Sequence, residues 1–228
     1  MKRELDYFCI DGRIGGRQSW FWHPIMRRKG CASIAAADSC ISLARTFGLD
    51  RLCPYDAWEL SRRKYKEFAH HMRREYLTPG PRGVSRLDLY IEGMKRYLAD
   101  VGEEGITMTA LSGHAPVEDA AKAIRSQLNQ GILVPCLTLR HREKKKMDDY
   151  IWHWFLLTGY EDRPDGLWIR ATTYGGCKWL PLKQLWDTGY EERGGLILYG
   201  LEQASKAWSM PEPALVIGPG LWDNCKNG

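Results

Sequence analysis

The sequence of 228 residues contains no long apolar run. Its most apolar stretch, residues 151–158, is far shorter than the roughly 20 residues that a helix needs to cross a bilayer, so a membrane span is excluded. The first residues, Met1-Lys-Arg-Glu-Leu-Asp, are charged, and neither an apolar segment nor a small-residue cleavage site follows them. We therefore expect no signal peptide and a cytoplasmic location.

Paired cysteines are also missing. The seven cysteines are an odd number, they are scattered along the chain, and no Cys-x-x-Cys occurs. Structural zinc sites need closely spaced pairs of such ligands, so we expect no metal site. The sequence likewise gives no sign of a cofactor.

The chain carries only a small excess of positive charge. The chain has 33 Lys and Arg against 28 Asp and Glu, a net charge of +5. A dedicated nucleic-acid binder usually concentrates more positive charge on one face, so we expect no nucleic-acid partner, although the basic runs 62–64, 73–74 and 140–146 keep that alternative open. The hydrophobic content of 44% is enough for a packed core and excludes intrinsic disorder.

The pattern of the chain changes from helical to extended near its middle. Residues 31–45 are small, with apolar positions at Ile34, Ala37 and Ile41, and Gly48 stands where a helix cap is expected. We expect further helices over 54–76, 83–101 and 115–131, then strands over 132–140, 150–160, 167–173 and 195–199. Arg163-Pro-Asp-Gly166 predicts a hairpin turn between two of these strands, because Pro fixes φ and Asp-Gly tolerates a positive φ. This order predicts an α+β fold in a single domain over 1–204. Its helical half covers about 18–131 and packs on an antiparallel sheet half of about 132–200, and an irregular tail follows over 205–228.

Cys31 is the strongest candidate for a nucleophile, because it begins a helix directly after Gly30. A helix N-terminus carries about half a positive charge, and the preceding Arg27, Arg28 and Lys29 add to it, so this position favours the thiolate. Gly30 would let a substrate carbonyl approach the backbone N–H of Cys31. The alternative is that Cys31 is a small buried core residue, which is the usual environment of a free cysteine.

His153 is the best candidate for the base that such a thiol needs. It is the only histidine inside an apolar strand pattern, where alternation places it on one face with Phe155 and Leu157. A satisfied histidine in the core is the alternative interpretation.

These residues resemble a known pattern. Three segments are similar to the motifs of the papain-like cysteine peptidase superfamily. They are Cys31 at the start of a small-residue helix, His153-Trp-Phe-Leu-Leu-Thr-Gly-Tyr160, and Thr172-Thr-Tyr-Gly175. The closest branch is the bacterial C39-like, bacteriocin-processing-like peptidases. The resemblance covers roughly residues 18–185, within which only short motifs match.

The resemblance implies a papain-like fold and a role for several further residues. Gln18 would supply a second oxyanion donor beside the N–H of Cys31. Thr172 falls where the family has Asn or Asp, and its hydroxyl would orient His153 without supplying a charge. Trp20, Trp22 and Tyr174 would form the walls of the cleft, together with Gly30; a place in the ordinary core is the alternative for the three aromatic residues.

The resulting prediction is a thiol-dependent hydrolase, a cysteine peptidase or amidase-like enzyme, with a Cys31–His153 dyad and a peptide or protein substrate. Peptide hydrolysis, side-chain deamidation and transpeptidation use the same apparatus, and the sequence does not separate them. A catalytically weak or inactive papain-like fold that acts as a binding module is the alternative, because Thr172 carries no charge. The sequence does not indicate the oligomeric state.

Overall fold

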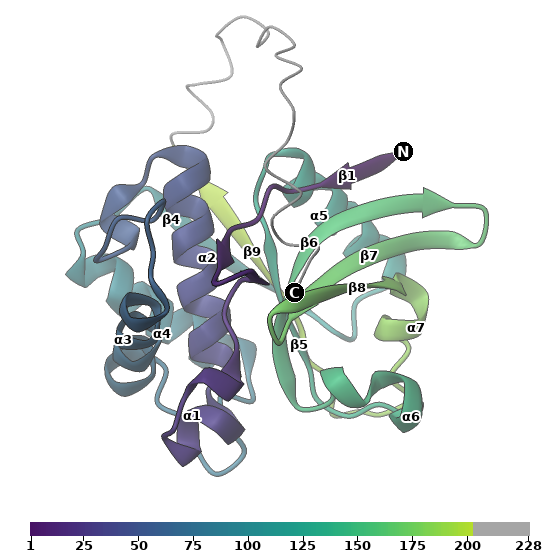
Figure 1. Cartoon of the computed structure of the whole chain (residues 1–228). Helices are drawn as coiled ribbons and strands as arrows, with labels where there is room; N and C mark the ends of the chain where they lie inside the picture. Colours follow the sequence, from purple (N-terminus) through teal and green to yellow (C-terminus); the bar gives the residue numbers. More distant parts are fainter. Residues whose placement is uncertain (203–228) are drawn as a thin grey trace, which may run out of the picture.

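The computed structural model of the chain describes residues 1–202 and has an α+β fold (Figure 1). Most helices come in the first half of the chain, and the second half is dominated by an antiparallel sheet. In the described part, no helix has the length and apolar character needed to cross a membrane. The irregular tail expected over 205–228 lies outside the described residues.

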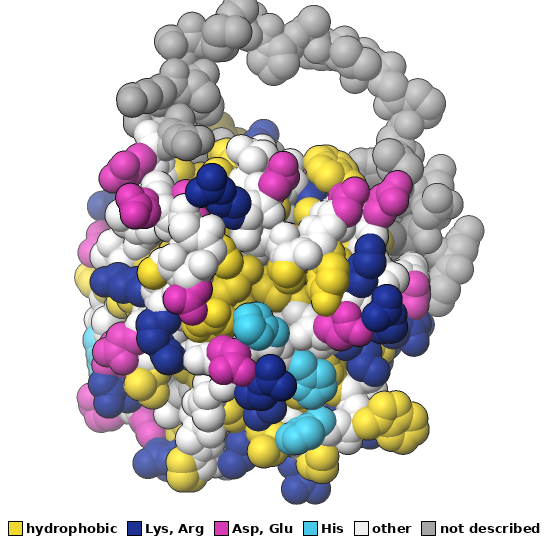
Figure 2. Space-filling model, turned by 90° about the vertical axis from the view of Figure 1, so that its left-hand side faces the viewer, with side chains coloured by type: hydrophobic (Ala, Val, Ile, Leu, Met, Phe, Trp, Pro, Cys, Tyr) yellow, Lys and Arg dark blue, Asp and Glu magenta, His cyan; other side chains and the backbone are white. Residues whose placement is uncertain are grey.

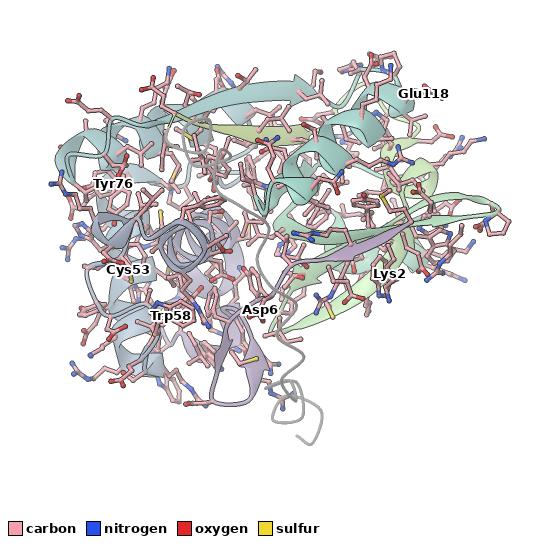
Figure 3. All side chains as sticks on the ribbon, turned by 90° about the horizontal axis from the view of Figure 1, so that it is seen from above. Lys2, Asp6, Cys53, Trp58, Tyr76 and Glu118 are labelled. Carbon is pink, nitrogen blue, oxygen red and sulfur yellow. The ribbon has the colours of Figure 1, made fainter. Side chains whose placement is uncertain are left out.

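Helix α2 (Cys31–Phe47) lies in the middle of the molecule (Figure 1), and residues 31–44 are all buried. A helix buried on every side must be packed on every side, and here α3 and α4 lie on one side of it and the sheet on the other. Figure 3, seen from above, shows the helical side with Cys53, Trp58 and Tyr76 on one side of the molecule and strand β1 with Lys2 on the other. The predicted end of this helix is confirmed, since Gly48 adopts the left-handed conformation with φ 67°.

The other helices cover α2 and the sheet. They are α1 (Pro24–Lys29), α3 (Arg62–His71), α4 (Leu87–Asp100), α5 (Val117–Asn129), α6 (Lys144–Met147) and α7 (Leu182–Trp186). The helix expected over 54–76 begins later, at α3, because Ser61 is its N-cap and accepts a hydrogen bond from the N–H of Lys64. It continues into a π-helical turn, Met72–Tyr76.

Seven strands form the main sheet within residues 1–202, in the order β4-β9-β5-β6-β7-β8, and β1 also pairs with β6. They are β1 (Lys2–Glu4), β4 (Ile106–Ser112), β5 (Val134–Thr138), β6 (His153–Arg163), β7 (Gly166–Thr173), β8 (Gly176–Pro181) and β9 (Gly195–Leu201). A separate pair joins β2 (Cys9–Ile10) to β3 (Arg13–Ile14). Because β4 pairs with β9, the sheet includes residues that the sequence placed in the helical half.

Tight hairpins join β6 to β7 and β7 to β8 at opposite ends of these strands, and the second one lies at the end that carries His153. The predicted turn between β6 and β7 is confirmed, with Arg163 paired to Gly166. Strands β7 and β8 are joined by Tyr174 and Gly175 alone, with φ of 53° and 79°. Positive φ at both positions is the requirement of a type I′ hairpin turn, which favours Asn-Gly. Tyrosine at the first position is strained, so its ring is placed there against a local preference.

Asp38 is the charged residue at the centre of the helical side. Its carboxylate accepts hydrogen bonds from the hydroxyls of Tyr7 (3.0 Å) and Tyr65 (2.7 Å) and from the N–H of Gly16 (3.0 Å). Burial nevertheless raises the pKa of Asp38 to about 6. The carboxylate therefore joins α2, α3 and the N-terminal segment.

The contribution of Asp38 to the free energy of unfolding falls as pH rises from 4 to 6. Over this range the folded chain binds more protons at Asp38 than the unfolded chain, whose carboxyl has its ordinary pKa of 3.8. We expect the difference in unfolding free energy between wild type and Asp38→Asn to shrink by about 3 kcal/mol between pH 4 and 7, at 1.36 kcal/mol per pKa unit. Urea unfolding measures it, and Asp100→Asn, which removes an exposed carboxylate that accepts from Tyr76, is the control. Equal slopes in wild type and Asp38→Asn would contradict the assignment.

Candidate active site

Cys31 is positioned by a tight turn between two helices. Gly30 ends α1 and begins α2, and its N–H donates to the carbonyl of Met26 at 3.1 Å. A Cβ at position 30 would lie 2.5 Å from that carbonyl oxygen, so only glycine fits there. Gly30 therefore has a structural role in this turn, besides any room that it leaves for a substrate.

The structure brings Cys31 and the start of β6 together. The backbone N–H of Trp154, the residue after His153, hydrogen-bonds to the thiol of Cys31. Tyr174 stacks on the ring of His153 and lies near Cys31. Cys31 thus lies where α2 packs on β6, next to Trp154 and Tyr174, the residues that flank His153, although Cys31 and His153 are 122 positions apart in the chain.

The hydroxyl that contacts His153 belongs to Thr173, and the prediction for Thr172 is corrected. His153 Nε2 and Thr173 Oγ1 share a hydrogen bond of 2.7 Å. The hydroxyl of Thr172 is instead 2.7 Å from that of Thr158. Side chains alternate along a strand, so neighbouring threonines on β7 point to opposite faces. The hydroxyl partner of the imidazole thus lies on β7, one residue after the predicted position.

Tyr174 covers the imidazole. Its ring lies parallel to that of His153, with centroids 4.6 Å apart and an interplanar angle of 11°. Its hydroxyl is 3.4 Å from His153 Nδ1, the ring nitrogen that Thr173 leaves free. The side chain is 42% exposed, so it separates the imidazole from solvent without being buried itself.

Burial keeps both members of the dyad uncharged. It raises the pKa of the Cys31 thiol, and hydrogen bonds from the N–H groups of Trp154 and Ala32 offset only part of this effect. It lowers the pKa of His153 to about 4, against the opposing effect of the Asp149 carboxylate. The thiolate expected from the helix N-terminus and its basic neighbours is therefore not the resting form, because the loss of solvation outweighs them.

A cavity of about 270 Å³ opens beside Cys31. Its aromatic wall is made of Trp152 and Trp154. Neither was a predicted site residue, although alternation along β6 places Trp154 on the face opposite His153. The indole N–H of Trp154 donates to the carbonyl of Val84 at 2.6 Å, which fixes the loop before α4 against the sheet.

The tryptophans predicted as cleft walls lie elsewhere. Trp20 packs edge-on against Tyr65 under the guanidinium of Arg62, on the α3 side, and Trp22 is 88% exposed. Neither lines the cavity beside Cys31. These two expectations are corrected, and Tyr174 is the predicted aromatic that reaches the dyad.

Gln18 is buried in a short 3₁₀ turn near the start of α2. Its side-chain amide donates to the carbonyls of Met26 and Arg27, both at 3.2 Å. The two amide hydrogens are thus used at the end of α1. In the resting protein Gln18 supports the turn that carries Cys31, and its role as an oxyanion donor stays a prediction.

Helix α3 carries a cluster of basic side chains on its surface. A hollow there is lined by Arg62, Arg63, Lys66 and His70 together with Glu67. Figure 2 shows acidic side chains among the basic ones on this face, and Arg63 and Arg74 are paired with Glu67 and Glu75. The charge is mixed, as on an ordinary solvated surface.

Comparisons of the chain with protein-family models, with curated proteins and with solved structures found no match. In the described part of the chain, no group of three or more His, Cys, Asp or Glu side chains is arranged to hold a metal ion. The chemistry of the site therefore depends on the fold and on the thiol of Cys31, the imidazole of His153 and the hydroxyl of Thr173.

The neutral dyad predicts how the Cys31 thiol reacts with iodoacetamide. Since its pKa is raised, we expect a slow reaction at pH 5–7 and a rate that climbs through pH 9 without a low-pH plateau. Exposed Cys177 should react faster at every pH, as followed by peptide mapping. His153→Gln should leave the shape of the profile unchanged. Fast alkylation of Cys31 at pH 5–6 that disappears in His153→Gln would show a resting ion pair and contradict this prediction.

Proposed function

We propose that the protein is a thiol hydrolase of papain-like organisation that cleaves peptide or amide bonds through Cys31 and His153. One observation carries the proposal. The start of α2 presents a thiol that lines a cavity to the first residues of β6, among which an imidazole has a hydroxyl partner. The order of helices and antiparallel strands supports the same class, with the cysteine at a helix start and the histidine at a strand start.

The resting state sets the first step. Cys31 and His153 are both neutral, so the S–H proton moves to His153 Nδ1 while sulfur attacks the substrate carbonyl. For this transfer the Tyr174 hydroxyl, 3.4 Å from Nδ1, gives way to the thiol. Nε2–H donates to Thr173 Oγ1, which holds the ring in its tautomer.

The later steps use the same groups. The tetrahedral oxyanion is stabilised by backbone N–H groups at the start of α2, which have no carbonyl partner within the helix. His153 then gives its proton to the leaving amine, and the thioester remains on Cys31. A water molecule, activated by neutral His153, hydrolyses the thioester and regenerates the thiol.

A weakly active or inactive papain-like binding module is the second candidate. It is favoured by the uncharged Thr173 and by Tyr174 over the imidazole. A hydroxyl supplies orientation to an imidazolium but no compensating charge, so the proton transfer is less favourable than with a carboxylate. The two candidates differ in whether Cys31 forms and releases an acyl group.

Acylation of Cys31 tests the proposal. A short peptide thioester supplies an activated acyl group, and intact-mass spectrometry with peptide mapping follows its transfer. We expect wild type to gain the acyl mass at Cys31 and to lose it by hydrolysis, Cys31→Ala to gain nothing there, and His153→Gln to react at least about 100-fold more slowly. Acylation of exposed Cys177 is the internal control. A chain in which Cys31 stays unmodified is not a hydrolase of this kind, and the binding module then leads.

The neighbouring threonines provide a matched test of the imidazole partner. Thr173→Val removes the hydroxyl bonded to His153, and we expect deacylation to slow about ten-fold, the value of one hydrogen bond of about 1.4 kcal/mol. Thr172→Val removes a hydroxyl that contacts Thr158 instead and should stay within about two-fold of wild type. Thr173→Asp places a carboxylate there and should raise the rate by stabilising the imidazolium. The reverse order of the two valine variants would return the role to Thr172.

A further inference from the structure

The cavity beside Cys31 has an apolar floor and a basic mouth. Val84, Leu137, Leu139 and Trp154 line it and are buried. Arg28 and Arg82 also line it and are exposed, and Lys29, which lines it too, is half-buried. No acidic side chain of the described residues lines this cavity.

Two of these cations are available to a ligand. Within residues 1–202, neither Arg28 nor Lys29 lies within 4.0 Å of a carboxylate. Arg82, in contrast, is paired with Glu192 at 2.6 Å and lies 5.7 Å from the Trp152 ring. The positive charge at the mouth is therefore uncompensated at the end of α1, next to the nucleophile.

A second cavity, of about 550 Å³, lies on the other side of the dyad. Thr173 and Tyr174 line it, and both contact His153. Its walls also carry Arg17 and Lys178, and among the described residues that line it the acidic one is Asp149, which Lys178 pairs at 2.6 Å. Positive charge thus flanks the thiol and imidazole on both sides.

We propose that the substrate is an acidic peptide whose acyl side carries a glutamyl-like side chain in the cavity beside Cys31. An aliphatic stem fits the apolar floor, and the carboxylate at its end reaches Arg28 and Lys29 at the mouth. Arginine and lysine are the usual partners of carboxylates, and the apolar wall lowers the screening of the interaction. This proposal rests on the proposed hydrolase function and adds the class of substrate.

Iodoacetate and iodoacetamide measure the charge of the cavity independently of turnover. The two reagents alkylate the same thiolate, so the ratio of their rates at Cys31 does not depend on the thiol pKa. At low salt we expect a ratio above that of 2-mercaptoethanol, falling as NaCl is added. Arg28→Gln and Lys29→Gln should each lower it about two-fold, the effect of one charge at about 8 Å in water.

Arg27→Gln is the matched control. It removes the same charge from the adjacent position of α1, but Arg27 does not line the cavity. We expect its ratio to stay close to that of wild type. A wild-type ratio no higher than that of 2-mercaptoethanol, or an equal decrease in Arg27→Gln, overturns the proposed basic cavity.

Peptide thioesters that differ in one side chain test the substrate itself. Matched peptides with Glu, Gln or Lys next to the thioester should acylate Cys31 in the order Glu, Gln, Lys. The preference should collapse in the double variant Arg28→Gln/Lys29→Gln and persist in Arg27→Gln. Equal rates, or a preference for Lys, overturn the proposed substrate class.

The two measurements separate the two proposals. If no thioester acylates Cys31, the hydrolase function fails, while the iodoacetate ratio still decides whether the cavity is basic. If acylation occurs without a preference for Glu, the hydrolase stands and the acidic substrate is rejected.

Discussion

The burial of α2 over residues 31–44 is the constraint on which the rest of the structure depends. Small side chains let the sheet and the surrounding helices approach this helix closely. The buried carboxylate of Asp38 accepts three hydrogen bonds from other segments of the chain. Cys31 begins the same helix and is 7% exposed. The packing that orders the fold is thus also the packing that removes the thiol from water.

Burial decides the chemistry of the dyad more than the helix N-terminus does. The partial charge at the start of α2 and the cations of α1 favour a thiolate, but a desolvated sulfur and a desolvated imidazole both favour their neutral forms. Thr173 adds orientation without charge, and Tyr174 is held over the ring by a strained turn. In the proposed hydrolase, charge separation would therefore come with the attack on the substrate, after Tyr174 has moved from Nδ1.

Local patterns predicted α2, its glycine cap and the β6–β7 hairpin, because each has a strong periodicity or turn signal. Strand β4 was missed because only Ile106 and Met108 of it are buried, so its alternation is weak. Cys31 and His153 could be selected from their positions in a helix and a strand. Thr173 was missed by one residue, since the sequence does not fix strand register, and the shifted pKa values depend on burial by distant segments.

The neutral dyad and the basic cavity are consistent with each other. A resting thiolate would repel a carboxylate close to it and would neutralise part of the positive charge of Arg28 and Lys29. A buried, protonated Cys31 leaves that charge unopposed, so an anionic acyl group can enter before sulfur carries any charge. In the proposed complex, the carboxylate is held at the mouth and its stem displaces water from the floor and from the space around the thiol. The binding energy of the acidic side chain would then support a proton transfer that the uncharged Thr173 cannot promote alone.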